Sequence, residues 1–140
     1  MIMYMIYGIP GSGKTTHARK IIQIYQDKNI PILHYEADMF FEKDGKYNFN
    51  PKLLNAAHSW CKKMVKEAME NKIDVIVSNT SLTPKERKVY FKLAKLFDYE
   101  IQVISLNNTY PNIHGVPKEK IEIMKKRYVP FNLSELDFEI

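Results

Sequence analysis

A glycine-rich segment of eight residues near the N-terminus limits the possible folds of this chain more than any other feature. It reads Gly8-Ile9-Pro10-Gly11-Ser12-Gly13-Lys14-Thr15 and matches in full the pattern G-x-x-x-x-G-K-[ST] of a phosphate-binding loop. The apolar run 2–7 before it predicts a buried strand. A helix is predicted after it, because apolar side chains recur there at helical spacing, at Ala18, Ile21, Ile22 and Tyr25.

Strand, loop and helix in this order suit the binding of a phosphate group. The loop amides point toward the anion and the helix N-terminus adds positive potential. Lys14 is expected to reach the outer phosphates and Thr15 to bind Mg²⁺, so ATP and Mg²⁺ are the expected nucleotide and ion. An ordinary glycine-rich turn is the alternative. The expected nucleotide contacts are Gly8, Pro10, Gly11, Ser12, Gly13, Lys14, Thr15 and Thr16.

Composition excludes several other classes of protein. The chain has 140 residues, 45% of them apolar, which predicts one folded domain over 1–140 rather than a disordered chain. Cys61 is the only cysteine, so no internal disulfide is expected, and no apolar run reaches the length of a membrane span. Because the chain begins directly with a strand, no signal peptide is expected and a cytoplasmic location is predicted. A net charge of +5 is compatible with a polyanionic partner.

Apolar strand-like runs alternate with helical periodicities, which is typical of an α/β fold. We expect a P-loop kinase fold with a mostly parallel sheet of four to five strands, flanked by helices. One helix is expected from the N-cap Asn50 to about Asn71, and another after the capping box 83–86. A polar loop is expected over 44–50, and 131–140 predict no element. Further strands are expected at 32–35, 73–77 and 101–106. The second helix is expected to bury Val89, Tyr90, Leu93, Leu96 and Phe97.

The region 107–130 is expected to form a C-terminal lid over the site. It opens with the turn-rich stretch 107–112 and continues with a basic helix, about 117–128, that has few apolar positions. Cations there suit phosphoryl transfer, because charge spreads onto oxygens in the transition state. Arg127 is the main candidate, since a guanidinium binds phosphate through two hydrogen bonds, and His114 is a candidate substrate contact. A solvated lysine-rich face is the alternative.

Ligands of open parallel sheets bind beyond the carboxyl ends of the strands. Asp38 follows the second strand, which is expected beside the first, and is predicted to face the γ-phosphate as a general base. A turn or helix-cap aspartate is the alternative. Glu36 lies on the same face but earlier in the strand, where burial is expected. The third strand runs into 78–81, whose Asn79 and Ser81 suit hydrogen bonds either to substrate or within a turn.

Over about Met3 to Arg127 the chain resembles the P-loop polynucleotide 5′-hydroxyl kinase family. Several segments in the same order carry this resemblance, and together they are more specific than the phosphate-binding loop alone. They are that loop, Ala37-Asp38 with Phe40-Phe41, Lys46-Tyr47-Asn48-Phe49, Ala57-His58 with Trp60-Cys61, Val75-Ile76-Val77-Ser78-Asn79-Thr80, Thr83, Asn112-Ile113-His114-Gly115-Val116-Pro117, Met124 and Arg127.

The resemblance implies that Asp38 activates the acceptor hydroxyl, while the loop binds the nucleotide phosphates and Mg²⁺. The chain also departs from the family. Its third strand ends in Ser78-Asn79-Thr80-Ser81 where the family usually has Asp-Thr-Asn or Asp-Asn-Thr-Asn, so a carboxylate that helps hold acceptor or metal is missing. Pro111 and Phe41 occupy positions where members have arginines of the lid and of the acceptor site.

Together these features favour an ATP-dependent kinase that phosphorylates the 5′-hydroxyl of RNA or DNA. A kinase for a nucleoside or another small metabolite, and a catalytically degenerate nucleotide-binding module, are the alternatives. A GTPase is disfavoured because the chain is too short to contain switch elements. The expected catalytic residues are Asp38, Lys14 and Arg127. The expected acceptor contacts are Asp38, Phe41, Asn79, Ser81 and His114.

Overall fold

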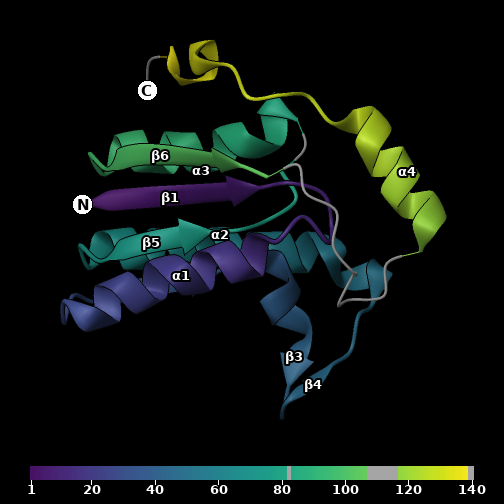
Figure 1. Cartoon of the computed structure of the whole chain (residues 1–140), viewed down its shortest axis with the longest axis horizontal. Coiled ribbons are helices and arrows are strands. Elements are labelled where there is room, and N and C mark those ends of the chain that lie inside the picture. Colours follow the sequence, from purple (N-terminus) through teal and green to yellow (C-terminus); the bar gives the residue numbers. More distant parts are fainter. Residues whose placement is uncertain (82, 107–116, 139–140) are drawn as a thin grey trace.

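Four parallel strands form the central sheet, in the order β2-β5-β1-β6. Their bounds are β1 Ile2–Tyr7, β2 Ile32–Tyr35, β5 Asp74–Val77 and β6 Glu100–Ser105. The computed structural model describes residues 1–81, 83–106 and 117–138. Figure 1 shows β5, β1 and β6 side by side with their carboxyl ends at one edge of the sheet. The predicted α/β fold with a parallel sheet is therefore confirmed.

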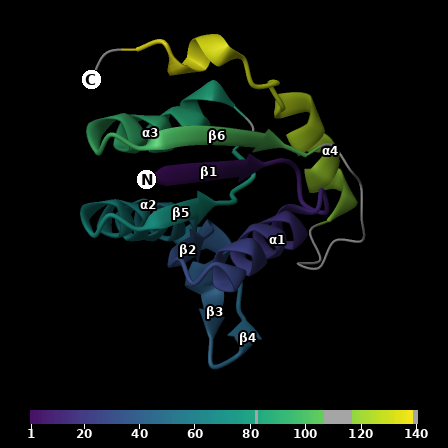
Figure 2. The same cartoon turned by 60° about the vertical axis from the view of Figure 1, so that its left-hand side comes forward.

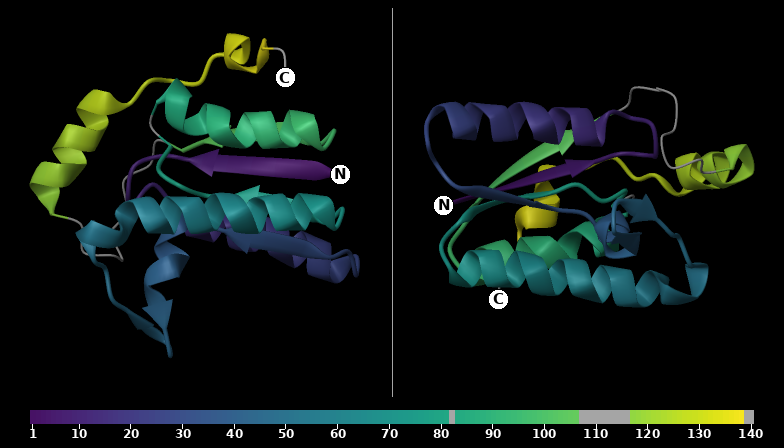
Figure 3. Two further views of the ribbon diagram at one scale, coloured as in Figure 1. Left: turned by 180° about the vertical axis from the view of Figure 1, so that it is seen from behind. Right: turned by 90° about the horizontal axis from the view of Figure 1, so that it is seen from below.

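Helices cover both faces of this sheet (Figure 3). α1, Lys14–Asp27, lies on one face, while α2, Leu54–Glu70, and α3, Pro84–Leu96, lie on the other. β5 lies between β1 and β2, so the expectation that the second strand lies beside the first is wrong. The reason is that α1 carries the chain past the position that β5 later fills. Such a change in strand order marks the usual ligand site of an open α/β sheet.

Side chains of β1 alternate between two parts of the core. Met3, Met5 and Tyr7 belong to the cluster with residues of α2 and α3, whereas Ile6 packs with Ala18 of α1. This alternation follows from the period of two along a strand. Since β1 is buried on both faces, its sequence is apolar throughout. The phosphate-binding loop is thus attached to a strand that is held from both sides.

The segment 44–50, expected to be a polar loop, includes part of a hairpin. β3, Glu42–Lys43, pairs in antiparallel fashion with β4, Lys46–Tyr47. Asp44 and Gly45, with φ of 51° and 75°, form the turn between them. Two successive positive φ values are typical of a type I′ hairpin turn, for which Asp-Gly is a favoured pair. The dipeptide was visible in the sequence, but its flanking strands are too short to show a periodic pattern.

Both predicted helix starts are confirmed. The Asn50 side chain accepts a hydrogen bond of 3.0 Å from the Lys52 amide, and a 3-10 turn, η2 Pro51–Leu53, leads into α2. Thr83 Oγ1 accepts a hydrogen bond of 3.3 Å from the Glu86 amide at the start of α3. Side-chain oxygens at these positions satisfy amides that have no partner within the helix.

The buried stripe of α3 differs from the predicted one. Tyr90 and Leu93 are buried as expected, but Val89 and Leu96 are 37% and 59% exposed. The buried positions also include Arg87, Phe91 and Ala94. The prediction from hydrophobicity placed the buried face of α3 incorrectly, because a fully buried arginine, Arg87, is part of that face.

Arg87 connects α3 to the C-terminal segment, for which the sequence predicted no element. A 3-10 turn, η3 Leu133–Leu136, forms there with a capping box between Asn132 and Glu135. Arg87 donates from Nε and Nη2 to the two carboxylate oxygens of Glu135, each at 2.9 Å, and from Nη2 to Val129 O at 2.9 Å. Its guanidinium carbon also lies 4.7 Å from the centre of the Tyr7 ring. This ion pair therefore helps to hold the segment against α3.

Glu135→Ala is expected to destabilise the fold by about 3 kcal/mol, because it leaves the charge of Arg87 buried without its counter-ion. Urea unfolding of both proteins measures the difference. Glu122→Ala is the matched control, since Glu122 forms an exposed pair with Lys125 at 3.6 Å and surface pairs contribute at most about 1 kcal/mol. Equal effects of the two substitutions would show that the Arg87 pair is not structurally important.

The basic helix expected in the lid region is present as α4, Lys118–Arg127, which lies beyond the carboxyl ends of β1 and β6 (Figures 1 and 2). Of the proposed lid, 107–116 lie outside the described residues. No helix in the described parts of the chain combines the length and the apolar character needed to cross a membrane.

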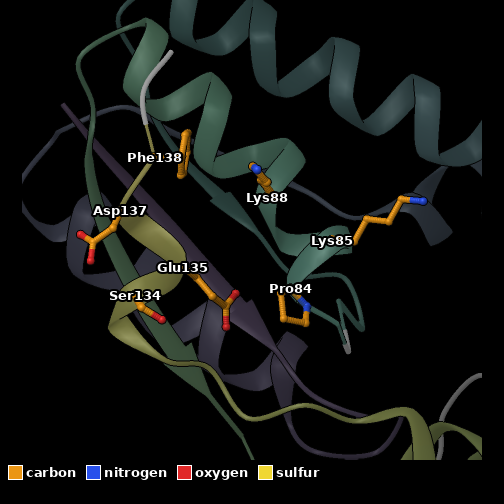
Figure 4. A pocket seen from close by; sticks show the side chains of 7 residues that line it. All are labelled: Pro84, Lys85, Lys88, Ser134, Glu135, Asp137 and Phe138. Carbon is orange, nitrogen blue, oxygen red and sulfur yellow. The ribbon is translucent and has the colours of Figure 1, made fainter.

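A hollow of about 240 Å³ lies between the start of α3 and the C-terminal segment (Figure 4). None of its lining residues belongs to the phosphate-binding loop. They are Pro84, Lys85, Lys88, Ser134, Glu135, Asp137 and Phe138.

Candidate active site

The phosphate-binding loop connects β1 to α1 at the carboxyl edge of the sheet. Gly11 and Gly13 have φ values of 83° and 94°, in the left-handed region that glycine adopts without strain. At position 8 glycine is required because neighbouring atoms leave no room for a side chain. A Cβ atom there would lie 2.6 Å from Leu106 O and from Ser12 Oγ. The Gly8 amide donates a hydrogen bond of 3.2 Å to Thr80 O, which ties the loop to the end of β5.

The residues of this loop fit an anion. Gly13 is the N-cap of α1 and provides no side-chain cap, and the first turn contains no acidic residue. Its amides are thus available to a phosphate group, together with the positive end of the helix dipole. Ser12 Oγ, in a residue 1% exposed, has no hydrogen-bond partner among the described residues. Thr15 and Thr16 follow in the first turn of the helix.

Lys14 lies over the loop. Its Nζ donates hydrogen bonds to Gly8 O at 2.9 Å and to Ile9 O at 3.1 Å. Burial lowers the pKa of the Lys14 ammonium to about 8, while the negative charges of Glu36 and Asp38 act in the opposite direction. The ammonium is therefore in the electrostatic range of two carboxylates that follow β2, and their negative charges favour its protonated form.

Asp38 lies in the 3-10 helix η1, Ala37–Phe41, directly after β2. Tyr47 of the hairpin donates a hydrogen bond of 3.1 Å from its hydroxyl to Asp38 Oδ1. Burial and the negative charge of Asp38 raise the pKa of Tyr47, so this phenol remains a donor. The sequence did not identify Tyr47 as part of the site, because its contact with Asp38 depends on the hairpin folding back on η1.

Asn79 and Ser81, both expected to contact the acceptor, are buried at the end of β5. Asn79 Oδ1 accepts a hydrogen bond of 2.7 Å from the Ala37 amide, and its Nδ2 donates to Tyr90 Oη at 3.1 Å. Ser81 O accepts a hydrogen bond of 2.9 Å from Arg87. Asn79 therefore joins β5 to the start of η1 and helps to position Asp38.

Phe41, another expected acceptor contact, is 4% exposed. Its ring centre lies 5.4 Å from that of Phe40, 5.1 Å from that of Phe49 and 6.3 Å from that of Tyr47. These contacts hold η1 against the hairpin and leave little of the ring accessible to a ligand. Phe40 is less buried and also packs against Trp60.

Glu36 and Ser78 lie at the ends of adjacent strands. The Ser78 hydroxyl donates a hydrogen bond of 2.9 Å to Glu36 Oε2 and lies 2.6 Å from His34 Nε2. Burial, with a smaller effect of the Arg19 charge, lowers the pKa of His34 to about 4, so the imidazole is neutral at physiological pH. The described residues include no group of three His, Cys, Asp or Glu side chains arranged to hold a metal ion.

Arg127 lies at the end of α4 and forms an exposed ion pair with Glu86 of α3. Lys14 and Asp38 are brought to the same edge of the sheet, whereas Arg127 is held at the start of α3. His114 lies outside the described residues.

A parallel sheet with β1 at its centre, a phosphate-binding loop leading into α1, and a carboxylate after β2 define a P-loop kinase-like domain. Residues 3–109 match the AAA domain family (AAA_33), and the chain belongs to this family. Membership of the P-loop class implies that the domain binds a nucleotide.

One related protein is human NEDD4-binding protein 2, which is 33% identical over 141 aligned residues. The alignment covers 94% of this chain but only 8% of the human protein.

Several solved structures share the fold. Kti12 from Chaetomium thermophilum, in complex with ADP-AlF3, has a TM-score of 0.68 and 15% identity, over 93% of this chain and 81% of its own. The APS kinase CysC from Mycobacterium tuberculosis has a TM-score of 0.60 and 13% identity, over 87% and 66%. A chain of a Pnkp1/Rnl/Hen1 complex has a TM-score of 0.58 and 18% identity, over 98% and 43%. At identities of 13% to 18% these similarities show the fold alone and assign no acceptor.

Proposed function

We propose that this domain transfers the γ-phosphoryl group of ATP to the 5′-hydroxyl of a nucleic acid. The observation that supports a transferase is the position of Asp38 in η1 after β2, at the same edge of the parallel sheet as the phosphate-binding loop. The negative charge of Asp38 also favours the ammonium form of Lys14. A carboxylate at this edge of the sheet, close to Lys14, is suitably placed to accept the proton of a hydroxyl that attacks the terminal phosphate.

In this mechanism Asp38 accepts the proton of the acceptor hydroxyl as its oxygen bonds to the γ-phosphorus. The bond from that phosphorus to the β,γ-bridging oxygen breaks, and ADP leaves. Lys14 and the first amides of α1 stabilise the negative charge on the phosphate oxygens. Tyr47 orients the Asp38 carboxylate through its hydrogen bond. Mg²⁺, held by the Thr15 hydroxyl and the phosphates, would neutralise part of that charge.

Charge supports a nucleic acid as acceptor. The cationic side chains of α4 are exposed beyond the carboxyl ends of the strands, where a phosphate backbone would approach the site (Figure 1). The net charge of the chain is +5, and one structure that shares the fold belongs to an RNA repair complex, Pnkp1/Rnl/Hen1. The cations are Lys118, Lys120, Lys125, Lys126 and Arg127.

A small-molecule acceptor is the second candidate. Phe41 occupies the position where some polynucleotide kinases that this chain resembles have an acceptor-binding arginine. Its side chain is buried in an aromatic cluster and carries no positive charge that could bind an acceptor phosphate. The similarity to the APS kinase fold is compatible with this alternative.

A phosphate-transfer assay with γ-labelled ATP tests the proposal. We expect label on RNA or DNA oligonucleotides that carry a 5′-hydroxyl, and none on the same oligonucleotides already phosphorylated at the 5′-end. Label on nucleosides alone would favour the small-molecule kinase. Nucleotide binding without transfer to any hydroxyl would favour a degenerate module.

A further inference from the structure

A buried hydroxyl in the phosphate-binding loop has no hydrogen-bond partner and no role in the mechanism described above. Among the described residues, Ser12 Oγ is the one buried side-chain nitrogen or oxygen atom without such a partner, and Ser12 is 1% exposed. Burying a hydroxyl without a hydrogen bond costs free energy, so an unpaired one in a folded protein calls for an explanation. We therefore looked for a partner that comes from outside the chain.

The motif of the loop assigns no role to this side chain. The pattern G-x-x-x-x-G-K-[ST] allows any residue at the position of Ser12, and its phosphate contacts come from loop amides, the lysine and the hydroxyl that follows the lysine. The Ser12 amide is used within the loop, because it donates a hydrogen bond of 3.2 Å to Ile9 O. The hydroxyl is thus the group of Ser12 that can serve a ligand.

The Ser12 hydroxyl lies inside the loop, against Gly8. A Cβ atom at Gly8 would lie 2.6 Å from Ser12 Oγ and 3.1 Å from Ser12 Cβ. Leu106 O crowds the same point at 2.6 Å, but no hydrogen bond joins it to Ser12. Lys14 Nζ donates a hydrogen bond of 2.9 Å to Gly8 O, so the ammonium and the hydroxyl are both next to Gly8. A phosphate oxygen that binds Lys14 therefore comes close to Ser12.

Two glycines flank Ser12 and allow the chain to turn there. Gly11 and Gly13 have φ values of 83° and 94°. Because glycine adopts either sign of φ at similar cost, the peptide units on both sides of Ser12 rotate without the steric barrier of a side chain. Such a rotation moves a hydroxyl from the inside of the loop to the surface at which a phosphate group binds.

We propose that the Ser12 hydroxyl is a phosphate ligand, which turns outward when a nucleotide binds and donates a hydrogen bond to a phosphate oxygen. Binding then forms a hydrogen bond to a charged group and removes an unsatisfied buried hydroxyl in the same step. Ser12 thereby favours the nucleotide-bound form of the loop over the form without nucleotide. This inference rests on the nucleotide binding of the proposed function and not on transfer to an acceptor.

Ser12→Ala is expected to act differently on stability and on binding. Without nucleotide the variant should be as stable as the wild-type protein or melt up to about 4 °C higher, because an unsatisfied hydroxyl has been removed. Calorimetric titration with a non-hydrolysable ATP analogue should show an affinity about 10- to 100-fold weaker, since a hydrogen bond to a charged group is lost. Titration with inorganic tripolyphosphate should show the same fold-change, because the contact is with phosphate.

Two serines provide matched controls. Ser78 is also 1% exposed, but its hydroxyl donates a hydrogen bond of 2.9 Å to Glu36 Oε2. Ser78→Ala should therefore lower the melting temperature, because the buried Glu36 carboxylate loses a donor. Ser59 is exposed on α2, and Ser59→Ala should change neither the melting temperature nor the affinities.

A fall in the melting temperature of Ser12→Ala as large as that of Ser78→Ala would overturn the proposal, because the hydroxyl would then have a partner without nucleotide, such as a trapped water. An unchanged affinity would also overturn it, as would a loss with the ATP analogue but not with tripolyphosphate. Failure of the wild-type protein to bind either probe would contradict the nucleotide site itself. A failed transfer assay with binding intact would contradict only the proposed transfer.

Discussion

Lys14→Ala is expected to weaken ATP binding about 100-fold or more. The ammonium makes charge-assisted contacts with phosphate oxygens, and losing hydrogen bonds to charged groups costs about 1.5–3 kcal/mol each. The same ammonium donates hydrogen bonds to Gly8 O and Ile9 O, so it already lies over the phosphate-binding loop. Titration calorimetry of the wild-type and variant proteins measures the change.

Lys20→Ala is the control for this variant. Lys20 is exposed on α1 and carries the same charge, but it is more than a helical turn beyond the loop. Its loss should change the affinity by less than about threefold, because exposed charges are screened by salt. If Lys14→Ala binds ATP as tightly as Lys20→Ala does, the loop is not the nucleotide site.

Asp38→Asn is expected to lower kcat by about 100- to 10,000-fold, the usual contribution of a general base. Asparagine keeps the shape of the side chain and an oxygen that accepts the hydrogen bond from Tyr47, but it does not take up the acceptor proton. The affinity for ATP should therefore persist. Transfer kinetics and calorimetry on the same preparation separate the two quantities.

Asp44→Asn is a matched control for the aspartate. Asp44 has a φ of 51° in the hairpin turn, a conformation that asparagine also tolerates, and it is exposed. The substitution removes one negative charge from the same part of the molecule and should leave kcat unchanged. A fall in kcat that is the same for both variants would mean that charge in general, and not a base at Asp38, drives the effect.

The fold was predictable because its signals are local. The phosphate-binding loop, the apolar run before it and the caps at Asn50 and Thr83 are each contained in a few consecutive residues, and the structure has the predicted elements at these places. Lys14 and Asp38 were identified in the same way, from a motif and from a strand end. Their expected roles remain predictions that the two variants above test.

The contacts that hold the site together depend on how the hairpin and the neighbouring strands fold against one another. Tyr47 reaches Asp38 only through a hairpin whose strands are two residues long, and Asn79 reaches the Ala37 amide from another strand. The interior position of Arg87 on α3 depends on Glu135, 48 residues later. Sequence spacing contains no sign of such pairs.

The amino-acid sequence by itself determined the alternation of strands and helices, the loop between β1 and α1, and the set of polar residues at the strand ends, because backbone preference and hydrophobic period act over short distances. Only the tertiary structure decided the strand order that inserts β5 between β1 and β2. That order brings Glu36 against Ser78 and buries Asn79 beside η1, since residues at the ends of adjacent strands meet whatever their separation in the chain.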